Sequence, residues 1–175
     1  QKPDYIFCIG WSSLLKKNIL KIPKFFSIGF HPTELPKNRG RNPIIWSIFL
    51  NLKQTASTFF ILNEKADNGP IISQKKILIS KNESSTTLYK KILIVSKKQI
   101  NVIVDTIIKK KNINFIKPKY TKTNFWRKRT FKDGLIDWRM NHEAIDRTVK
   151  ALSWPYPGAF FKYKNKFIKI KSCKK

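Results

Sequence analysis

Short apolar runs separated by turn residues are the feature that most limits how this chain can fold. Residues 5–9 form one such run and predict a buried strand of the parallel type. Residues 25–30, 56–62 and 71–79 predict three further strands, rich in β-branched and aromatic side chains. Each run is short for a helix, and the first is bounded by Pro3 and Gly10. A sheet is therefore the expected centre of the fold.

Helical patterns alternate with these strands. Asn42 and Pro43 are residue types that favour the N-cap and first position of a helix, and the apolar spacing that follows predicts that helix. Residues 86–110 predict one or two helices. Residues 141–152 predict another, with Asn141 as its N-cap. The alternation up to about residue 110 favours an α/β sheet. Beyond it, residues 159–170 predict a β-hairpin.

The charge of the chain is extreme, with a formal net value of +27. Of the 37 basic residues, 31 are Lys and only 6 are Arg. Arg is the side chain suited to bidentate phosphate recognition, so this balance favours compositional drift over a dedicated nucleic-acid face. The charge would still attract an anionic substrate.

Cysteine and histidine are scarce. Cys8 and Cys173 form no C-x-x-C pair and the chain has two histidines, which argues against a zinc site. The low cysteine count fits a reducing compartment, so we expect a cytoplasmic protein. No apolar run approaches the ~20 residues of a membrane span. The chain starts at Gln1 and enters a buried strand almost at once, so we expect an N-terminally truncated sequence.

Two polar residues follow predicted strands and are candidates for chemistry. His31 comes directly after residues 25–30, and Asp67 lies on the loop after residues 56–62, so both can share one edge of the sheet. A carboxylate beside an imidazole raises the pKa of the imidazole and fixes the orientation of the ring. The alternatives are a loop histidine and a turn-forming Asp before Asn68-Gly69. His142 reads as a surface residue. Arg39 and Arg41 are either solvated charges or an anion site beside His31.

Three blocks of sequence, in order, resemble a known family. FHPTELPKNRGRNPIIW is similar to the H-x-S-L-L-P-x-x-R-G-x-x-P-x-x-W signature of the 10-formyltetrahydrofolate-dependent formyltransferases. FILNEKADNGPIISQ resembles the M-D-x-x-x-D-x-G-x-I-x-x-Q block of that family, and places Asp67 36 residues after His31. A third block, DGLIDWRMNHEAIDRTVKALSWPYPGAFF, resembles the crossover into the family's C-terminal domain.

The resemblance implies an α/β, Rossmann-like formyltransferase domain that lacks its first strands, followed by the beginning of a small OB-like β domain. We expect residues 1–115 to form the catalytic part, 116–133 a linker and 134–175 the start of the C-terminal domain. Without the first strands of the family's sheet, the strand at residues 5–9 would form an unpaired, apolar edge of the sheet.

The resemblance also assigns chemistry. His31 matches the catalytic histidine, and Asp67 matches the carboxylate that tunes it. The family carries an Asn two positions before the histidine, where it donates to the oxyanion, and this chain has Gly29 there. Losing such a donor costs on the order of 3 kcal/mol, so a substitute is expected from Asn63, Asn42 or a backbone N–H.

The implied formyl donor is 10-formyltetrahydrofolate, with no metal. For Leu14 and Leu15, which are among the expected contacts of this donor, packing in the core is an equally good interpretation. By position, these contacts are Ser13, Leu14, Leu15, Arg41, Asn63, Glu64, Lys65, Ala66 and Asp67.

The sequence leaves more than one candidate for the amine that accepts the formyl group. RGRNPIIW and STFFIL resemble the nucleotide-sugar enzymes of the family better than the tRNA enzymes, so a nucleotide-linked amino-deoxysugar is the preferred acceptor and methionyl-tRNA the alternative. An inactive truncated homologue is a second alternative, and a homodimer is one open assembly state. A simple nucleic-acid-binding module is disfavoured, because no aromatic stacking motif accompanies the lysines.

Overall fold

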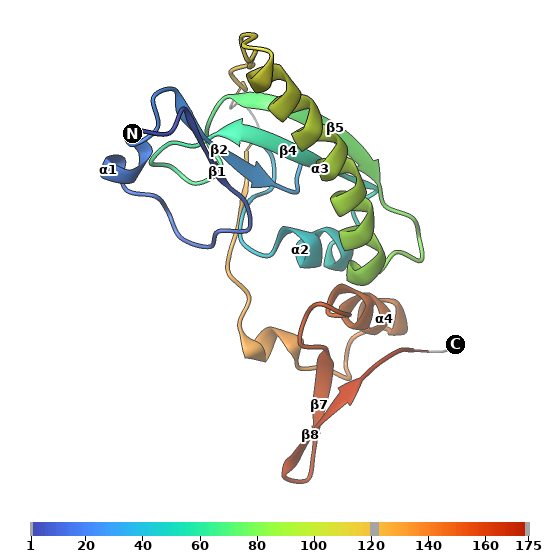
Figure 1. Ribbon diagram of the computed structural model, residues 1–175. Helices are drawn as coiled ribbons and strands as arrows, with labels where there is room; N and C mark the ends of the chain where they lie inside the picture. The colour runs from blue at the N-terminus through green and yellow to red at the C-terminus, as the bar shows by residue number, and fades with distance from the viewer. Residues whose placement is uncertain (1, 120–122, 174–175) are drawn as a thin grey trace.

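The computed structural model describes residues 2–119 and 123–173. A sheet with a long helix across it forms one tier, and a short helix with a hairpin forms a second tier beside it (Figure 1). Residue 1, residues 120–122 of the expected linker and residues 174–175 of the expected C-terminal domain lie outside the described part.

The sheet has four strands in the order β1-β2-β4-β5. Strands β1 (Tyr5–Cys8) and β2 (Phe26–His31) are parallel, while β4 (Gln54–Ile61) is antiparallel to both β2 and β5 (Ile71–Leu78). All four predicted strands are confirmed, and so is the α/β class. Only one of the three pairings is parallel, however. Strand β4 runs antiparallel to β2 although helix α2 lies between them in the chain, and β4 and β5 form a hairpin.

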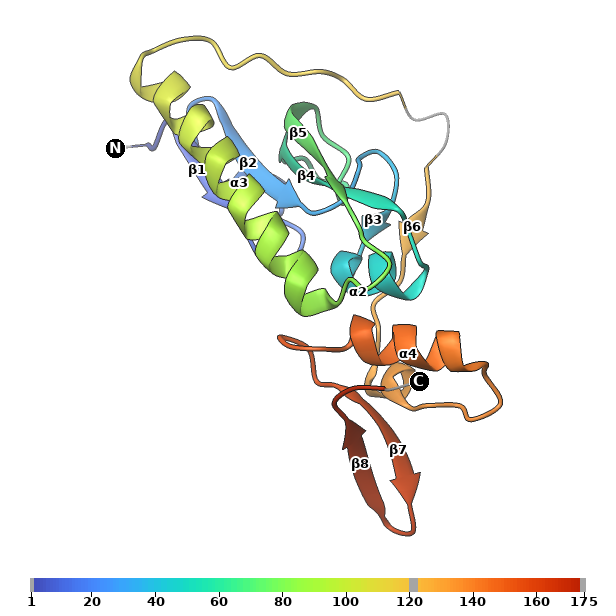
Figure 2. The same ribbon diagram turned by 90° about the vertical axis from the view of Figure 1, so that its right-hand side faces the viewer.

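Helix α3 (Ser85–Ile108) lies across one face of the sheet (Figures 1 and 2). The sequence left one or two helices open, and the structure has one. Ser84 begins it with a capping box: its hydroxyl accepts from the Thr87 amide, and the Thr87 hydroxyl accepts from the Ser84 amide. The other elements are α1 (Lys17–Leu20), β3 (Arg39–Gly40), α2 (Pro43–Phe49), β6 (Phe125–Trp126), the 3₁₀ turn η1 (Phe131–Gly134), α4 (His142–Ala151), β7 (Ala159–Tyr163) and β8 (Lys166–Ile170).

Helix α2 begins at Pro43 with Asn42 at its N-cap position, as predicted, but the side-chain capping bond typical of an Asn there does not form. Asn42 adopts a left-handed conformation (φ 54°) and its side chain makes no capping bond. Its Oδ1 accepts instead from the backbone N–H of Arg129, at 2.9 Å. The start of α2 is therefore tied to a segment almost ninety positions later, which local sequence could not indicate.

One apolar cluster joins the two tiers. Ile48 of α2, Leu88 of α3 and Val149 of α4 are all buried in it. Helix α4 has a capped N-terminus, since the Asn141 side chain accepts from the Ala144 amide as predicted. The predicted hairpin is present as β7 and β8. The C-terminal segment thus shares a core with the sheet domain, and the division at residues 115 and 133 stays a prediction.

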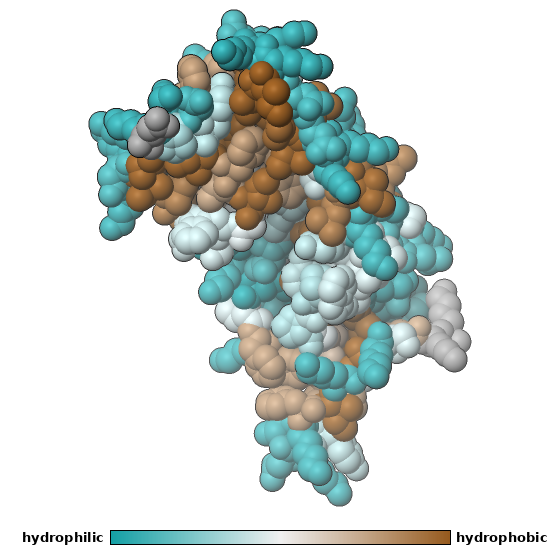
Figure 3. All heavy atoms as spheres, in the orientation of Figure 1, coloured by the Kyte–Doolittle hydropathy of each residue, from teal (hydrophilic) through white to brown (hydrophobic). Residues whose placement is uncertain are grey.

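The first strand lies at the edge of the sheet, and apolar side chains around it reach the surface. Phe7 and Ile9 are 37% and 47% exposed. Hydrophobic surface gathers over the tier that contains β1 and α3 (Figure 3). Leu93 and Ile94 of α3 are also exposed. Within the described ranges, no helix combines the length and apolarity that crossing a membrane requires.

The hydroxyl of Ser85 donates to the Ala151 carbonyl at 2.6 Å, in a buried position that joins α3 to the end of α4. Ser85→Ala should lower the free energy of unfolding by about 1–3 kcal/mol, because the carbonyl loses a partner where water cannot replace it. Urea denaturation would measure the loss. Ser96→Ala is the matched control, since Ser96 bonds only a carbonyl of its own helix. Equal losses in the two variants would contradict the proposed link between the tiers.

Candidate active site

His31 is the last residue of β2, and the residue is only 6% exposed. Nε2 lies 3.1 Å from the Asn38 carbonyl oxygen, and Nδ1 lies 3.5 Å from Oδ1 of Asp67. A carbonyl oxygen can only accept, so Nε2 must carry the proton in this hydrogen bond. In the neutral ring, Nδ1 is then the nitrogen with a lone pair, and it faces the carboxylate.

Asp67 reaches His31 by a route different from the one expected. Because β4 is antiparallel to β2, with His31 opposite Thr58 and Ile28 opposite Ile61, the end of β4 points away from the end of β2. The two residues therefore do not share an edge as consecutive parallel strands would. The loop after β4 folds back instead.

Gly69 makes this fold-back possible. A Cβ at this position would lie 1.6 Å from the carbonyl oxygen of Ile61, so no larger residue fits. Asp67 itself adopts a left-handed conformation (φ 49°), which Asp tolerates better than most residues. The turn-forming character of the Asp67-Asn68-Gly69 stretch is thus what carries the carboxylate to the histidine.

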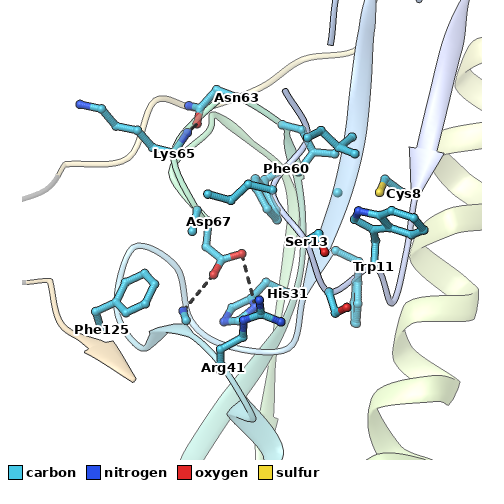
Figure 4. A pocket seen from close by; sticks show the side chains of 18 residues that line it. Cys8, Trp11, Ser13, His31, Arg41, Phe60, Asn63, Lys65, Asp67 and Phe125 are labelled. Carbon is cyan, nitrogen blue, oxygen red and sulfur yellow. Dashed lines mark hydrogen bonds and ion pairs between the residues drawn. The ribbon is translucent and has the colours of Figure 1, made fainter. Parts of the chain in front are cut away.

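A second loop holds Asp67 from the other side. The Gly40 amide donates to Oδ2 of Asp67 at 2.9 Å, and the Arg39 guanidinium donates to the Asn68 side chain at 3.0 Å. Gly40 has φ 105°, and a Cβ there would lie 2.2 Å from the Trp126 carbonyl oxygen, so only glycine fits. Figure 4 shows Asp67 between this amide and His31, with Arg41 beside the pair.

Burial dominates the protonation of His31. Desolvation lowers the pKa of His31 below its ordinary value of 6.5, while the charge of Asp67 and the bond to Asn38 act in the opposite direction more weakly. The imidazole is therefore neutral at neutral pH. A neutral imidazole whose Nδ1 faces a carboxylate can accept a proton there, and the carboxylate then stabilises the resulting cation.

The pair borders a cleft of about 260 Å³. The cleft collects most of the side chains expected to contact the formyl donor: Ser13, Leu14, Leu15, Arg41, Asn63, Lys65, Ala66 and Asp67. Glu64, the remaining expected contact, does not line it. Leu14 is 62% exposed, so core packing is wrong for that residue. His142 is exposed and pairs with Glu143, as expected of a surface residue.

Several lining residues were not found from the sequence. Cys8 and Trp11 come from the end of β1 and the loop after it, Phe60 and Leu62 from the end of β4, and Phe125 from β6. Phe125 lies in a stretch without periodicity, so no local signal connected it to His31. Burial raises the pKa of the Cys8 thiol. In the described part of the chain, no group of three or more His, Cys, Asp or Glu side chains is placed to hold a metal ion.

Gly29 lines the cleft, and a neighbouring side chain lies where a side chain at position 29 would be. A Cβ at position 29 would lie 2.5 Å from Cδ2 of Leu62 and 3.1 Å from Cζ of Phe60. The Leu62 side chain therefore occupies the space that a larger residue at position 29 would need.

The two candidate replacement amides lie in different places. Asn63 lines the cleft, where its Nδ2 donates to the Asn68 carbonyl and its Oδ1 accepts from the Lys65 amide. Asn42 is not part of the cleft lining.

These features agree with what known proteins show. Residues 1–107 match the formyl transferase family, and residues 128–175 match the formyl transferase C-terminal domain. The first match alone covers more than half of the chain, and the two occur in the order of the two tiers. The chain therefore belongs to the formyl transferase family.

Two curated relatives show what the chain is similar to. It is 39% identical over 159 residues to the bifunctional polymyxin resistance protein ArnA of Wigglesworthia glossinidia brevipalpis, covering 91% of this chain and 24% of that protein. It is 32% identical over 169 residues to the methionyl-tRNA formyltransferase of Thermodesulfovibrio yellowstonii, covering 96% of this chain and 54% of that protein. The chain thus spans about a quarter and about half of these relatives.

Solved structures share the fold. A 4-N formyltransferase from Francisella tularensis superposes with a TM-score of 0.78 at 22% identity, over 98% of this chain and 72% of that one. HypX from Aquifex aeolicus, in complex with tetrahydrofolic acid, superposes with a TM-score of 0.74 at 19% identity, over 95% of this chain and 28% of that one. The Rossmann-like class implied by the sequence is confirmed.

The protonation of His31 can be measured directly, because the chain has only two histidines. In an NMR titration, the His31 ring should gain its second proton at a pH below 6.5, since burial disfavours the cation. Asp67→Asn should move this midpoint to still lower pH, because the variant removes the charge that favours protonation while keeping an acceptor for the Gly40 amide.

His142→Asn would assign the two sets of signals, and Asp105→Asn, an exposed carboxylate on α3, is the charge-matched control. A His31 midpoint above 6.5, or one that Asp67→Asn leaves in place, would contradict the geometry described.

Proposed function

We propose that this chain transfers a formyl group from 10-formyltetrahydrofolate to a primary amine, with His31 and Asp67 as its catalytic pair. The observation that carries the proposal is the buried, neutral imidazole whose Nδ1 faces Asp67 at the border of the cleft. Family membership supports the reaction class, and the geometry supports the role proposed for each residue.

The cleft suits the formyl donor in its chemistry. Trp11, Phe60 and Phe125 supply flat aromatic surfaces, and Asn63 supplies an amide among them. A planar ring system with polar edges fits such a lining. When bound, 10-formyltetrahydrofolate supplies the formyl group. Ser13, Arg41 and the loop at residues 63–67 are the proposed contacts that hold it.

His31 handles the proton. The amine nitrogen bonds to the formyl carbon while the bond between that carbon and N10 of the folate breaks, so the amine must lose a proton and N10 must gain one. Nδ1 of His31 is the available base because Nε2 is engaged with Asn38, and the imidazolium can then return the proton to N10. Asp67, 3.5 Å away, stabilises the imidazolium that results. The Gly40 amide keeps the carboxylate directed at the ring. Holding two reactants together in the cleft supplies a large part of the rate.

A nucleotide-linked amino-deoxysugar is the acceptor we favour. The stretches RGRNPIIW and STFFIL resemble the sugar enzymes of the family, and Arg41 of the first stretch lines the cleft beside His31. Methionyl-tRNA is the second candidate acceptor. The similarity to the methionyl-tRNA formyltransferase of Thermodesulfovibrio yellowstonii and the net charge of +27 support it. We expect the reaction to take place in the cytoplasm.

The first test is an assay of this chain with 10-formyltetrahydrofolate and a panel of nucleotide-linked amino sugars, alongside methionyl-tRNA. Turnover should fall by about 10²–10⁴-fold in His31→Gln, which removes the base but keeps a polar side chain. Turnover should also fall on the acid side only below pH 6.5, because His31 must be neutral to accept a proton.

His142→Gln is the matched control and should turn over like the parent chain. Salt separates the acceptors, since affinity for tRNA falls steeply with ionic strength and affinity for a small sugar substrate falls little. A folded chain that forms no product with any acceptor would be an inactive homologue, and the proposal would be wrong for it.

The Gly29 departure yields a separate prediction. Gly29→Asn alone should lower stability and bring no gain in turnover, because the new side chain meets Leu62. Combined with Leu62→Ala, the Asn has room to act as an oxyanion donor, and turnover should rise above that of Leu62→Ala alone. Such a donor is worth about 3 kcal/mol where no other group fills the role. Equal turnover in these two variants would mean that Asn63 or a backbone N–H already fills it.

A further inference from the structure

Strand β6 brings a residue from the connecting segment to the loop that contacts His31. The Asn124 side chain makes two hydrogen bonds with one residue: its Oδ1 accepts from the Asn38 amide at 2.7 Å, and its Nδ2 donates to Oδ1 of Asn38 at 2.9 Å. The Asn124 carbonyl accepts from the Arg39 amide at 3.2 Å. Two residues 86 positions apart are thus joined by a reciprocal pair of amide contacts.

Asn38 is the residue whose carbonyl accepts from Nε2 of His31. It adopts a left-handed conformation (φ 58°), which costs energy in a residue other than glycine and needs support from its surroundings. The Asn124 side chain holds both the amide and the side chain of this residue, and so fixes the direction of its carbonyl.

The direction of that carbonyl matters because two acceptors compete for one proton. A neutral imidazole carries a single N–H, and His31 has the Asn38 carbonyl on one side and the Asp67 carboxylate on the other. A charged acceptor is normally the stronger one. The carbonyl can retain the proton on Nε2 only if it is held in place, and here it lies at 3.1 Å while the carboxylate lies at 3.5 Å.

We propose that Asn124 is a positioning residue, which fixes the Asn38 carbonyl so that the His31 proton stays on Nε2 and Nδ1 remains free to act as the base. This role of Asn124 rests on the proposed function, in which His31 is the base for formyl transfer. Asn124 does not itself line the cleft, and it acts on His31 through one intermediate, Asn38.

The structure separates this role from the general pairing of β3 with β6. That pairing uses backbone groups, including the Arg41 amide and the Trp126 carbonyl at 3.0 Å, and these remain when the Asn124 side chain is shortened. Asn124 is an exposed residue, so its replacement leaves no cavity in the core. Asn124→Ala therefore tests the side-chain contacts alone.

The test is the tautomer of His31, read by long-range ¹H–¹⁵N NMR, which distinguishes a protonated ring nitrogen from a bare one. The parent chain should show the Nε2–H form. Asn124→Ala should show a substantial population of the Nδ1–H form, since the Asp67 carboxylate now competes successfully for the proton. The pH at which the ring gains its second proton should also fall, because the Asn38 bond that favours protonation is weakened.

Two matched controls lie in the same segment. Thr123→Ala removes a 3.3 Å contact to the Arg39 guanidinium but leaves the contacts of Asn38 in place. Asn112→Ala changes an exposed side-chain amide that lies earlier in the chain than Asn124. Both should keep the Nε2–H form. An Asn124→Ala spectrum with the parent tautomer and the parent titration midpoint would overturn the proposal.

Turnover provides the second readout. With the best acceptor, kcat of Asn124→Ala should fall by on the order of tenfold while KM changes little, because the base is misplaced but the cleft is intact. A parent chain with the Nε2–H form but no turnover would contradict the proposed function while leaving the tautomer effect of Asn124 testable. A tautomer shift in Asn124→Ala with unchanged kcat would overturn the positioning role.

Discussion

The site depends on one buried imidazole placed between two hydrogen-bond acceptors. His31 is buried, so its protonation is decided by desolvation, by the Asn38 carbonyl and by the Asp67 carboxylate. Burial keeps the ring neutral, and the carbonyl selects which nitrogen carries the proton. Everything else near the ring serves to hold these two acceptors. Gly40 and Gly69 do so by allowing backbones to approach more closely than any side chain would permit.

The segment that connects the two tiers supports the site. Trp46 of α2 donates to the Arg127 carbonyl, and the Arg129 guanidinium lies 4.9 Å from the centre of the Trp46 ring. These contacts anchor the segment after β6, so that Asn124 and Phe125 stay against the loop that carries Gly40. The apolar cluster shared by α2, α3 and α4 fixes the same arrangement from the other side.

Gly29 shows how a departure from a family pattern is absorbed by packing. A missing Asn leaves space beside the reacting position, and in this chain the Leu62 side chain fills that space. The wall of the cleft is therefore more apolar here than the resemblance implies. Asn63, the amide that lines the cleft, lies one residue beyond Leu62, so the same turn that closes the gap also carries the replacement candidate.

The resemblance to the family identified His31 and Asp67 as a pair. Local sequence determined the strands and the three longer helices, because apolar spacing and turn residues act over a few positions. It could not determine how strand β4 runs beside β2, and the expectation of a shared sheet edge was wrong for that reason. The role of the segment around Asn124 and Phe125 was equally invisible, because it lacks periodicity and its partners lie more than eighty residues away. Tertiary structure alone decided which carbonyl faces His31, since hydrogen bonds between distant segments form only once the core has brought them together.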